Sequence, residues 1–268
     1  QEAAEESACD RSLLNLKNIL QFADEADPAD LAPVLNRQIE YNSKISAEGL
    51  TGKWGAAVGC TLLERQNPPS LELKARAWAA AGSDARMAGC SLPVVINSGS
   101  GNQGITITMP VVVYAEALGA SEEQRLRALA LANLISVHQK KYIGSLSAYC
   151  GAVSAATGAA CGVAYLKLKG KISEEALYQV MSDTITNSIC TIGGMVCDGA
   201  KSSCAAKIAA ALESAFTGLE MSLKQRVFQP GEGLTMDTVE DTIAAVGRMG
   251  RVGMKSTDVE ILNIMLGH

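Results

Sequence analysis

The stretch SLSAYCGAVSAATGAACGVAYLKL, residues 145–168, is the most apolar part of the chain, and the rest of the fold is expected to pack around it. Alanine, glycine, serine and valine surround two cysteines, Cys150 and Cys161. Side chains this small let neighbouring backbones approach closely, so the stretch predicts a buried central helix. It is also long enough to span a bilayer. Its hydroxyls, its three glycines and the lack of a second comparable span favour the buried helix.

Apolar residues recur at helical spacing in most of the remaining sequence. One such segment, residues 10–26, ends at Asp27-Pro28, and another begins at a capping box, Ser121-x-x-Gln124. The pattern predicts a mainly α protein, a compact multi-helix domain over residues 1–268, with one short extended and glycine-rich island near residues 90–110.

Composition narrows the classes of function. The chain carries a net charge of −5 and no basic stripe, which argues against binding nucleic acid. Eight cysteines without regular spacing, and the absence of a signal peptide, indicate reduced thiols and a cytoplasmic protein. The chain begins with Gln1 rather than methionine, so we expect it to be a piece of a longer protein.

The expected island is built from two β-type runs, residues 92–97 and 105–108, around the string SGSGNQG at 98–104. Its glycine spacing matches the dinucleotide fingerprint, but that fingerprint requires a helix to begin among the glycines, and we expect a second extended run there. We predict instead a loop rich in hydrogen-bond donors that holds a carboxylate, with a plain turn as the alternative. The candidate substrate-binding residues are Asn97, Ser98, Ser100, Asn102 and Gln103.

Three cysteines fall within residues 189–204, ICTIGGMVCDGAKSSC. Asp198 occupies an N-cap position ahead of a helix-forming run, which would place the Cys197 thiol at the positive end of a helix and favour its thiolate. Lys201 would add a positive charge, while the alternative is a helix start with ordinary buried cysteines. We expect the helix start at 197–201, the loop at 99–104 and the turn at 141–145 to border one cavity, because glycines and polar groups interrupt the apolar pattern at all three.

Three strings in order, SGSGNQGI at 98–105, KYIGSLSAYCG at 141–151 and GMVCDGAK at 194–201, resemble one family. It is the family of iron-sulfur L-cysteine desulfidases, whose bacterial members were long catalogued as an uncharacterised family and which is related to the α-subunit of iron-sulfur L-serine dehydratases. The resemblance covers roughly residues 45–266 and implies that Cys150 and Cys197 ligate a cluster. The family's third ligand lies in a Cys-Thr-Glu-Pro motif of an N-terminal region that this chain lacks. Cys60 shares only two letters with that motif, so the role does not transfer to it.

The resemblance also implies the chemistry. A 4Fe-4S cluster with three thiolate ligands leaves one iron open to the thiol or carboxylate of a small amino acid. A base removes the α-proton, the β-substituent leaves, and L-cysteine gives pyruvate, ammonia and sulfide. The candidate bases are Lys140, Lys141 and Lys201.

Two other functions stay open: deamination of L-serine in the manner of a serine dehydratase, and a non-catalytic helical module that binds a small carboxylate. Association into a homo-oligomer stays open as well. Among the other cysteines, four are expected to be structural and two are left undecided. The structural ones are Cys9, Cys60, Cys161 and Cys190, and the undecided ones are Cys90 and Cys204.

Overall fold

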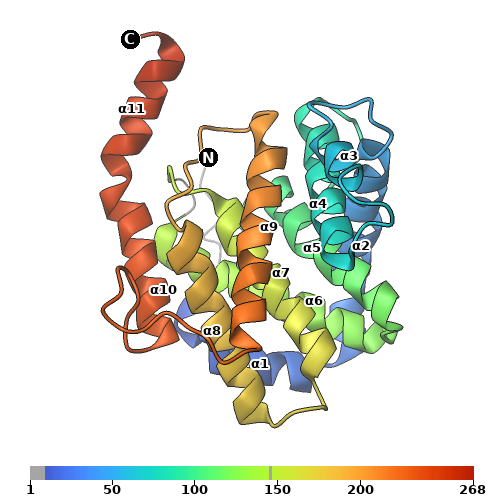
Figure 1. Ribbon diagram of the computed structural model, residues 1–268, viewed down its shortest axis with the longest axis vertical. Coiled ribbons are helices and arrows are strands. Elements are labelled where there is room, and N and C mark those ends of the chain that lie inside the picture. The colour runs from blue at the N-terminus through green and yellow to red at the C-terminus, as the bar shows by residue number, and fades with distance from the viewer. Residues whose placement is uncertain (1–9, 145–146) are drawn as a thin grey trace, which may run out of the picture.

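The computed structural model describes residues 10–144 and 147–268, which form α-helices joined by short loops (Figure 1). Within these ranges, extended pairing is limited to two isolated β-bridges. The expected mainly α class is therefore confirmed. The helices are α1 (Leu16–Glu25), α2 (Pro28–Gly49), α3 (Val58–Leu63), α4 (Leu71–Met87), α5 (Gly101–Leu118), α6 (Glu122–Ile143), α7 (Gly151–Leu168), α8 (Glu174–Ile192), α9 (Ser203–Ser222), α10 (Val239–Arg248) and α11 (Lys255–Leu266).

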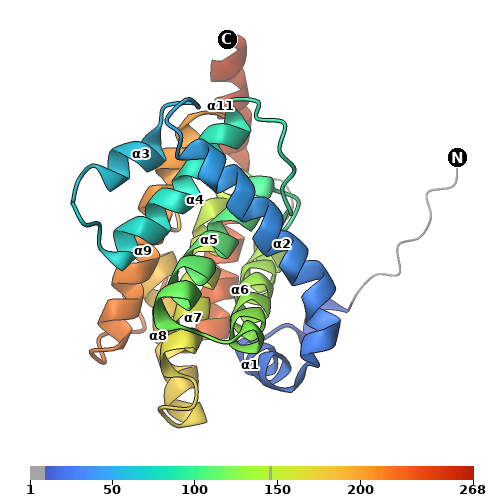
Figure 2. The ribbon, with the colours of Figure 1, turned by 90° about the vertical axis from the view of Figure 1, so that its right-hand side faces the viewer.

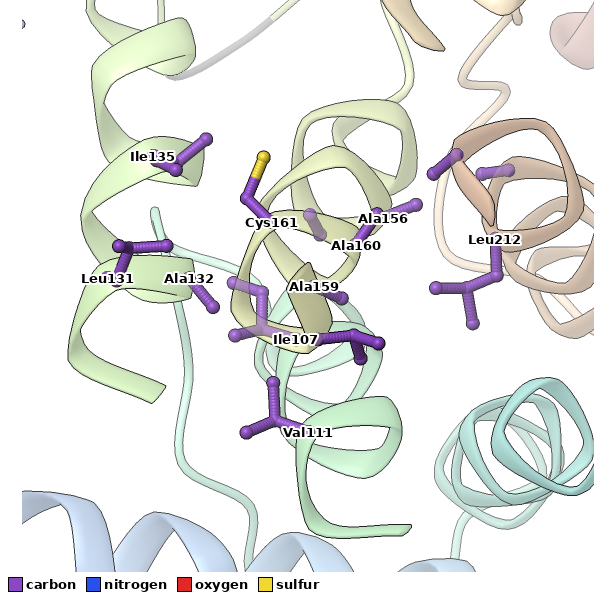
Figure 3. Close-up of a cluster of buried hydrophobic side chains, with 14 of the residues drawn as sticks. Ile107, Val111, Leu131, Ala132, Ile135, Ala156, Ala159, Ala160, Cys161 and Leu212 are labelled. Atoms are coloured by element: carbon purple, nitrogen blue, oxygen red, sulfur yellow. The ribbon is translucent and has the colours of Figure 1, made fainter. Parts of the chain in front are cut away.

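Helix α7 is the central helix that the sequence predicts. It packs against α5, α6, α8 and α9, and its residues from Ala152 to Tyr165 are all buried. It begins at Gly151 rather than at Ser145, which lies outside the described residues. Figure 3 shows the core between α5, α6, α7 and α9, where side chains from four helices meet, among them Ile107, Val111, Leu131, Ile135, Ala159, Cys161 and Leu212.

Two glycines of α7 explain how the helices come so close. A Cβ atom on Gly158 would lie 2.3 Å from the carbonyl oxygen of Ala132 in α6, and one on Gly162 would lie 3.0 Å from that of Ala128. The first separation is too short for a methyl group and the second would be a tight contact, so α6 and α7 touch backbone to backbone at Gly158. None of the helices in the described part of the chain combines the length and the apolar character needed to cross a bilayer.

The second extended run, at residues 105–108, is a wrong prediction, because these residues lie inside α5. This helix begins at Gly101 after the N-cap Ser100 and continues through Pro110. Helix α5 is buried on almost every side. Its sequence, rich in β-branched residues, therefore lacks the polar face from which a helical period is recognised. Within the island expected near residues 90–110, only residues 90–100, which lead into α5, are non-helical.

A helix therefore does begin among the glycines of the fingerprint-like string, contrary to our expectation. The described residues nevertheless contain no parallel strand before it, and the dinucleotide fold requires one. Asn97 and Ser100 instead pair with each other across a tight turn in which Ser98 and Gly99 adopt positive φ angles of 48° and 81°. The first residue of α5, Gly101, follows this turn directly and is buried.

The outer helices lie on two sides of this core. Helices α2, α3 and α4 cover one side, and α10 and α11 lie on the other (Figures 1 and 2). Helix α1 is tied to α10 and α6, because Glu240 accepts a hydrogen bond from the backbone N–H of Leu16 at 2.8 Å and contacts His138 at 2.7 Å. The arrangement leaves the ends of α4 and α6 and the starts of α5, α7 and α9 around one cavity.

Candidate active site

The cavity at these helix ends has a volume of about 450 Å³. Its wall contains the start of α5 and the turn before it, the end of α6, the start of α7 and the loop between α8 and α9. The segments around residues 99–104 and 197–201 thus border one cavity, as predicted. None of the described residues of the third predicted segment, 141–144, is in the wall, although Lys140 and Ser147 on either side of it are, and Ser145 lies outside the described residues.

A two-stranded backbone clasp brings the two cysteine segments together. The backbone N–H of Cys150 donates to the carbonyl oxygen of Met195 at 2.9 Å, and that of Cys197 donates to Ala148 at 2.6 Å. Tyr149 and Val196 form the antiparallel bridge between these bonds. Because the donor of each hydrogen bond is the backbone N–H of a cysteine, the clasp fixes both thiols at the same wall of the cavity.

The surroundings of the Cys150 and Cys197 sulfurs differ, and they shift the pKa values of the two thiols in opposite directions. The pKa of Cys197 is lowered, chiefly by a hydrogen bond from the Cys150 thiol and further by the Gly199 N–H and the positive charge of Lys207, against the effect of burial. The pKa of Cys150 is raised by the same hydrogen bond and by burial, although the Ala152 N–H opposes this. The pair therefore favours a Cys197 thiolate that accepts a hydrogen bond from a Cys150 thiol.

The thiolate is not stabilised in the way the sequence suggested. Asp198 is no N-cap, because α9 begins at Ser203 and residues 194–202 form an irregular loop with Gly199 at a φ of 93°. Asp198 instead forms an ion pair with Lys207 in the second turn of α9. That pairing holds Lys207 close to Cys197, and it replaces the helix end as the source of positive charge.

The three candidate lysines lie in different places. Lys140 lines the cavity with only 7% of its surface exposed, and burial lowers its pKa. Lys141 points away from the cavity and donates to the carbonyl oxygen of Leu14 at 2.6 Å. Lys201 is exposed and donates to the Asp198 carbonyl oxygen at 2.7 Å, and it is absent from the described wall. Only Lys140 is within the cavity.

Four of the five predicted substrate-binding residues line the cavity, and they are Ser98, Ser100, Asn102 and Gln103. Asn97 is absent from the described wall, because its side-chain amide donates to Asn133 Oδ1 at 3.0 Å behind the turn. Gln103 is 7% exposed, and its Oε1 has no hydrogen-bond partner among the described residues. Its carboxamide presses against the start of α7, where a Cβ atom on Gly151 would lie 2.5 Å away.

Sequence reasoning missed several residues of the wall. Arg86, in the last turn of α4, lines the cavity and donates to Asn102 Oδ1 at 3.3 Å. Ser147 and Tyr149 also line it, beside the clasp. A cation in the last turn of an alanine-rich helix that precedes the glycine-rich turn is the signal that could have pointed to Arg86.

The remaining cysteines lie in different parts of the structure. Cys204 is at the cavity wall, whereas Cys161 is fully buried in the core. Cys190 accepts a hydrogen bond from Thr235 at 3.4 Å, and Cys60 donates to the Leu50 carbonyl oxygen at 3.5 Å, both at positions outside the described wall. Within residues 10–144 and 147–268, no three histidine, cysteine, aspartate or glutamate side chains are grouped as a metal site.

Comparison with known proteins assigns this helical chain, with its cysteine-lined cavity, to a family. The family model described as serine dehydratase alpha chain matches residues 2–263. The chain belongs to the serine dehydratase alpha chain family.

The relatives found carry a general family name. UPF0597 proteins of Lachnoclostridium phytofermentans and Desulfitobacterium hafniense are 48% and 47% identical to this chain over 99% of its length. One from Finegoldia magna is 46% identical over 94% of it. The chain spans 62%, 60% and 58% of these three relatives, respectively, so each has further sequence with no counterpart here. No solved structure matches the chain.

Proposed function

We propose that this chain carries the cavity of an iron-sulfur-dependent lyase that performs α,β-elimination on L-cysteine and gives pyruvate, ammonia and sulfide. The observation that supports this most is the clasp that places Cys150 and Cys197 at the wall of a cavity containing the buried Lys140. Thiols, a buried amine and a helix start around one small space are the groups that this reaction needs.

The two cysteines suit the ligands of an iron-sulfur cluster. Thiolates bind iron, and the backbone N–H groups of Ala152 and Gly199 favour the ionised forms of Cys150 and Cys197, respectively. A 4Fe-4S cluster with one open iron would supply a Lewis acid for the thiol or carboxylate of the substrate. The third thiolate would come from a part of the longer protein that this chain does not include.

Lys140 is the residue we propose as the base. Burial lowers its pKa, and its Nζ makes no hydrogen bond or ion pair within the described part of the chain, so the amine is available to accept a proton. The α-proton of L-cysteine passes to Lys140 Nζ, the Cβ–S bond breaks, and sulfide leaves. The remaining enamine becomes an imine, which water hydrolyses to pyruvate and ammonia.

Substitution of the three lysines tests this role in the complete protein. Lys140→Met should lower kcat at least about 100-fold with unchanged iron content, the usual contribution of a general base. Lys141→Met and Lys201→Met serve as matched controls, because both side chains bind carbonyl oxygens elsewhere, and each should keep kcat within about threefold. Full activity in Lys140→Met would remove Lys140 from the mechanism.

L-Serine is the second candidate substrate, favoured by the name of the family. Elimination from serine expels hydroxide in place of sulfide and needs the same base. Comparing kcat/KM for L-cysteine and L-serine on protein purified without oxygen separates the two, and the proposal expects L-cysteine to be preferred. Turnover of neither substrate would favour a non-catalytic module that binds a small carboxylate.

A further inference from the structure

The cavity lacks acidic side chains although the protein is acidic. Arg86 is the side chain of its described wall that stays cationic, and no aspartate or glutamate is present there. The chain as a whole carries a net charge of −5. A permanent cation in a wall without carboxylates favours an anionic ligand.

Arg86 lacks an ionic partner, unlike the buried Arg76 and the half-buried Arg127. Arg76 pairs with Glu213 at 2.5 Å, and Arg127 pairs with Glu123 at 2.8 Å. Within the described residues, the guanidinium of Arg86 makes no salt bridge, and Asn102 Oδ1 at 3.3 Å is its one hydrogen-bond acceptor. A partly buried guanidinium has five N–H donors that require acceptors, so most of its binding capacity is left for a ligand.

The guanidinium lies against the first turn of α5, which adds further donors. A Cβ atom on Gly101 would lie 2.5 Å from Arg86 Nε, so the glycine is what allows this approach. The backbone N–H groups of Gly101 and Asn102 have no acceptor in the described part of the chain. They stand at the positive end of an 18-residue helix, where anions bind favourably.

Gln103 provides an independent indication of a ligand. Its side chain lines the cavity, is more than nine-tenths buried, and leaves Oε1 without a partner among the described residues. A buried carboxamide without partners is costly, and a bound polar molecule would satisfy it. Because the carboxamide can turn about its last bond, it can present its N–H₂ group to an anion.

We propose that Arg86, the N–H groups at the start of α5 and the Gln103 carboxamide form a subsite for the α-carboxylate of the substrate. The planar fork of an arginine matches the two oxygens of a carboxylate and stays charged at every relevant pH. Lys140, on the same wall, is then free to act on the α-carbon. The choice of an amino acid as the ligand rests on the proposed function, and the subsite restricts that ligand to molecules with a free carboxylate.

Calorimetry with two non-reacting probes tests the subsite in the complete protein. L-Alanine has a carboxylate but no β-leaving group, and L-alaninamide has no carboxylate. The wild-type protein should bind L-alanine at least about tenfold more tightly than L-alaninamide, a difference of about 1.4 kcal/mol. Equal affinity for the two probes would overturn the proposal, and this comparison needs no variant to fold.

Arg86→Gln should weaken L-alanine binding at least about tenfold and leave L-alaninamide binding unchanged. In turnover it should raise KM with kcat changed less than about threefold, and iron content should stay constant, because the carboxylate is held equally in the ground and transition states. Arg65→Gln is the matched control, since Arg65 is exposed on the loop after α3 and absent from the described wall. Unchanged L-alanine binding and KM in Arg86→Gln would overturn the subsite.

The two proposals fail in different ways. A protein that binds L-alanine through Arg86 but turns over neither L-cysteine nor L-serine keeps the carboxylate subsite and loses the proposed function. A protein that turns over L-cysteine with the same KM in wild type and Arg86→Gln keeps the proposed function and loses the subsite.

Discussion

Gly158→Ala tests whether α6 and α7 touch backbone to backbone. The added Cβ atom would lie 2.3 Å from the Ala132 carbonyl oxygen. Non-bonded heavy atoms settle at about 3.5 Å, so the two helices must separate by about 1 Å. A 2.3 Å contact with backbone belongs to the upper part of the overpacking range, about 2–3 kcal/mol, and replacing a helical glycine by alanine returns about 0.5–1 kcal/mol. The expected net loss is therefore about 1–2.5 kcal/mol.

Urea unfolding followed by circular dichroism measures this loss, and a thermal melt should show a midpoint about 2–8 °C lower. Gly253→Ala is the control, because the nearest atom to its added Cβ would be Met249 Cγ at 3.9 Å, an ordinary contact. The control should change the free energy of unfolding by less than about 0.5 kcal/mol. If Gly158→Ala is as stable as the wild type, the close packing of the central helix is wrong.

Two further predictions concern the half-buried carboxylate of Glu240 and the buried carboxylate of Asp84. The pKa of Glu240 is lowered from its usual 4.5, since hydrogen bonds from His138 and the Leu16 N–H outweigh the effect of burial. The stabilisation of the fold by the ionised Glu240 carboxylate is therefore present above pH 4.5 and disappears as the pH falls through the lower folded-state pKa. Glu240→Gln should lower the free energy of unfolding by about 1–3 kcal/mol at pH 7 and by progressively less in acid. Urea titrations at several pH values measure this, and a constant difference down to pH 3 would contradict it. Asp84 accepts a hydrogen bond from the Gly59 N–H at 3.0 Å. Asp84→Ala should therefore lower the free energy of unfolding by about 1–3 kcal/mol, which a thermal melt detects as a lower midpoint. An unchanged midpoint would show that α3 does not depend on this hydrogen bond.

Local patterns in the sequence were sufficient for most of the fold. The capping box at Ser121 and Gln124 is present with both hydrogen bonds, and the small residues of 151–168 form the central helix. The failure at residues 105–108 has a physical cause: a helix buried on all sides loses the polar face that reveals its period, and its β-branched residues then resemble a strand.

The candidate site was predictable only in part, because tertiary contacts assemble it. The family resemblance pointed to Cys150 and Cys197, but the clasp that joins them connects residues 47 positions apart in the chain. The sequence could not separate Lys140 from Lys141, since adjacent helical residues differ only in the direction each side chain takes. Arg86 was missed because its role depends on the packing of α4 against the start of α5.

The most direct test of the cysteine site is iron and acid-labile sulfide analysis of the complete protein, purified without oxygen, as wild type and as three variants. The wild type should contain about four irons and four sulfides per chain. Cys150→Ser and Cys197→Ser should each lose iron, sulfide and lyase activity. Cys161→Ser, in the core, should keep its iron and retain activity within about tenfold, about 1.4 kcal/mol in the barrier. A normal cluster in Cys197→Ser would contradict the assignment of Cys197 as a ligand.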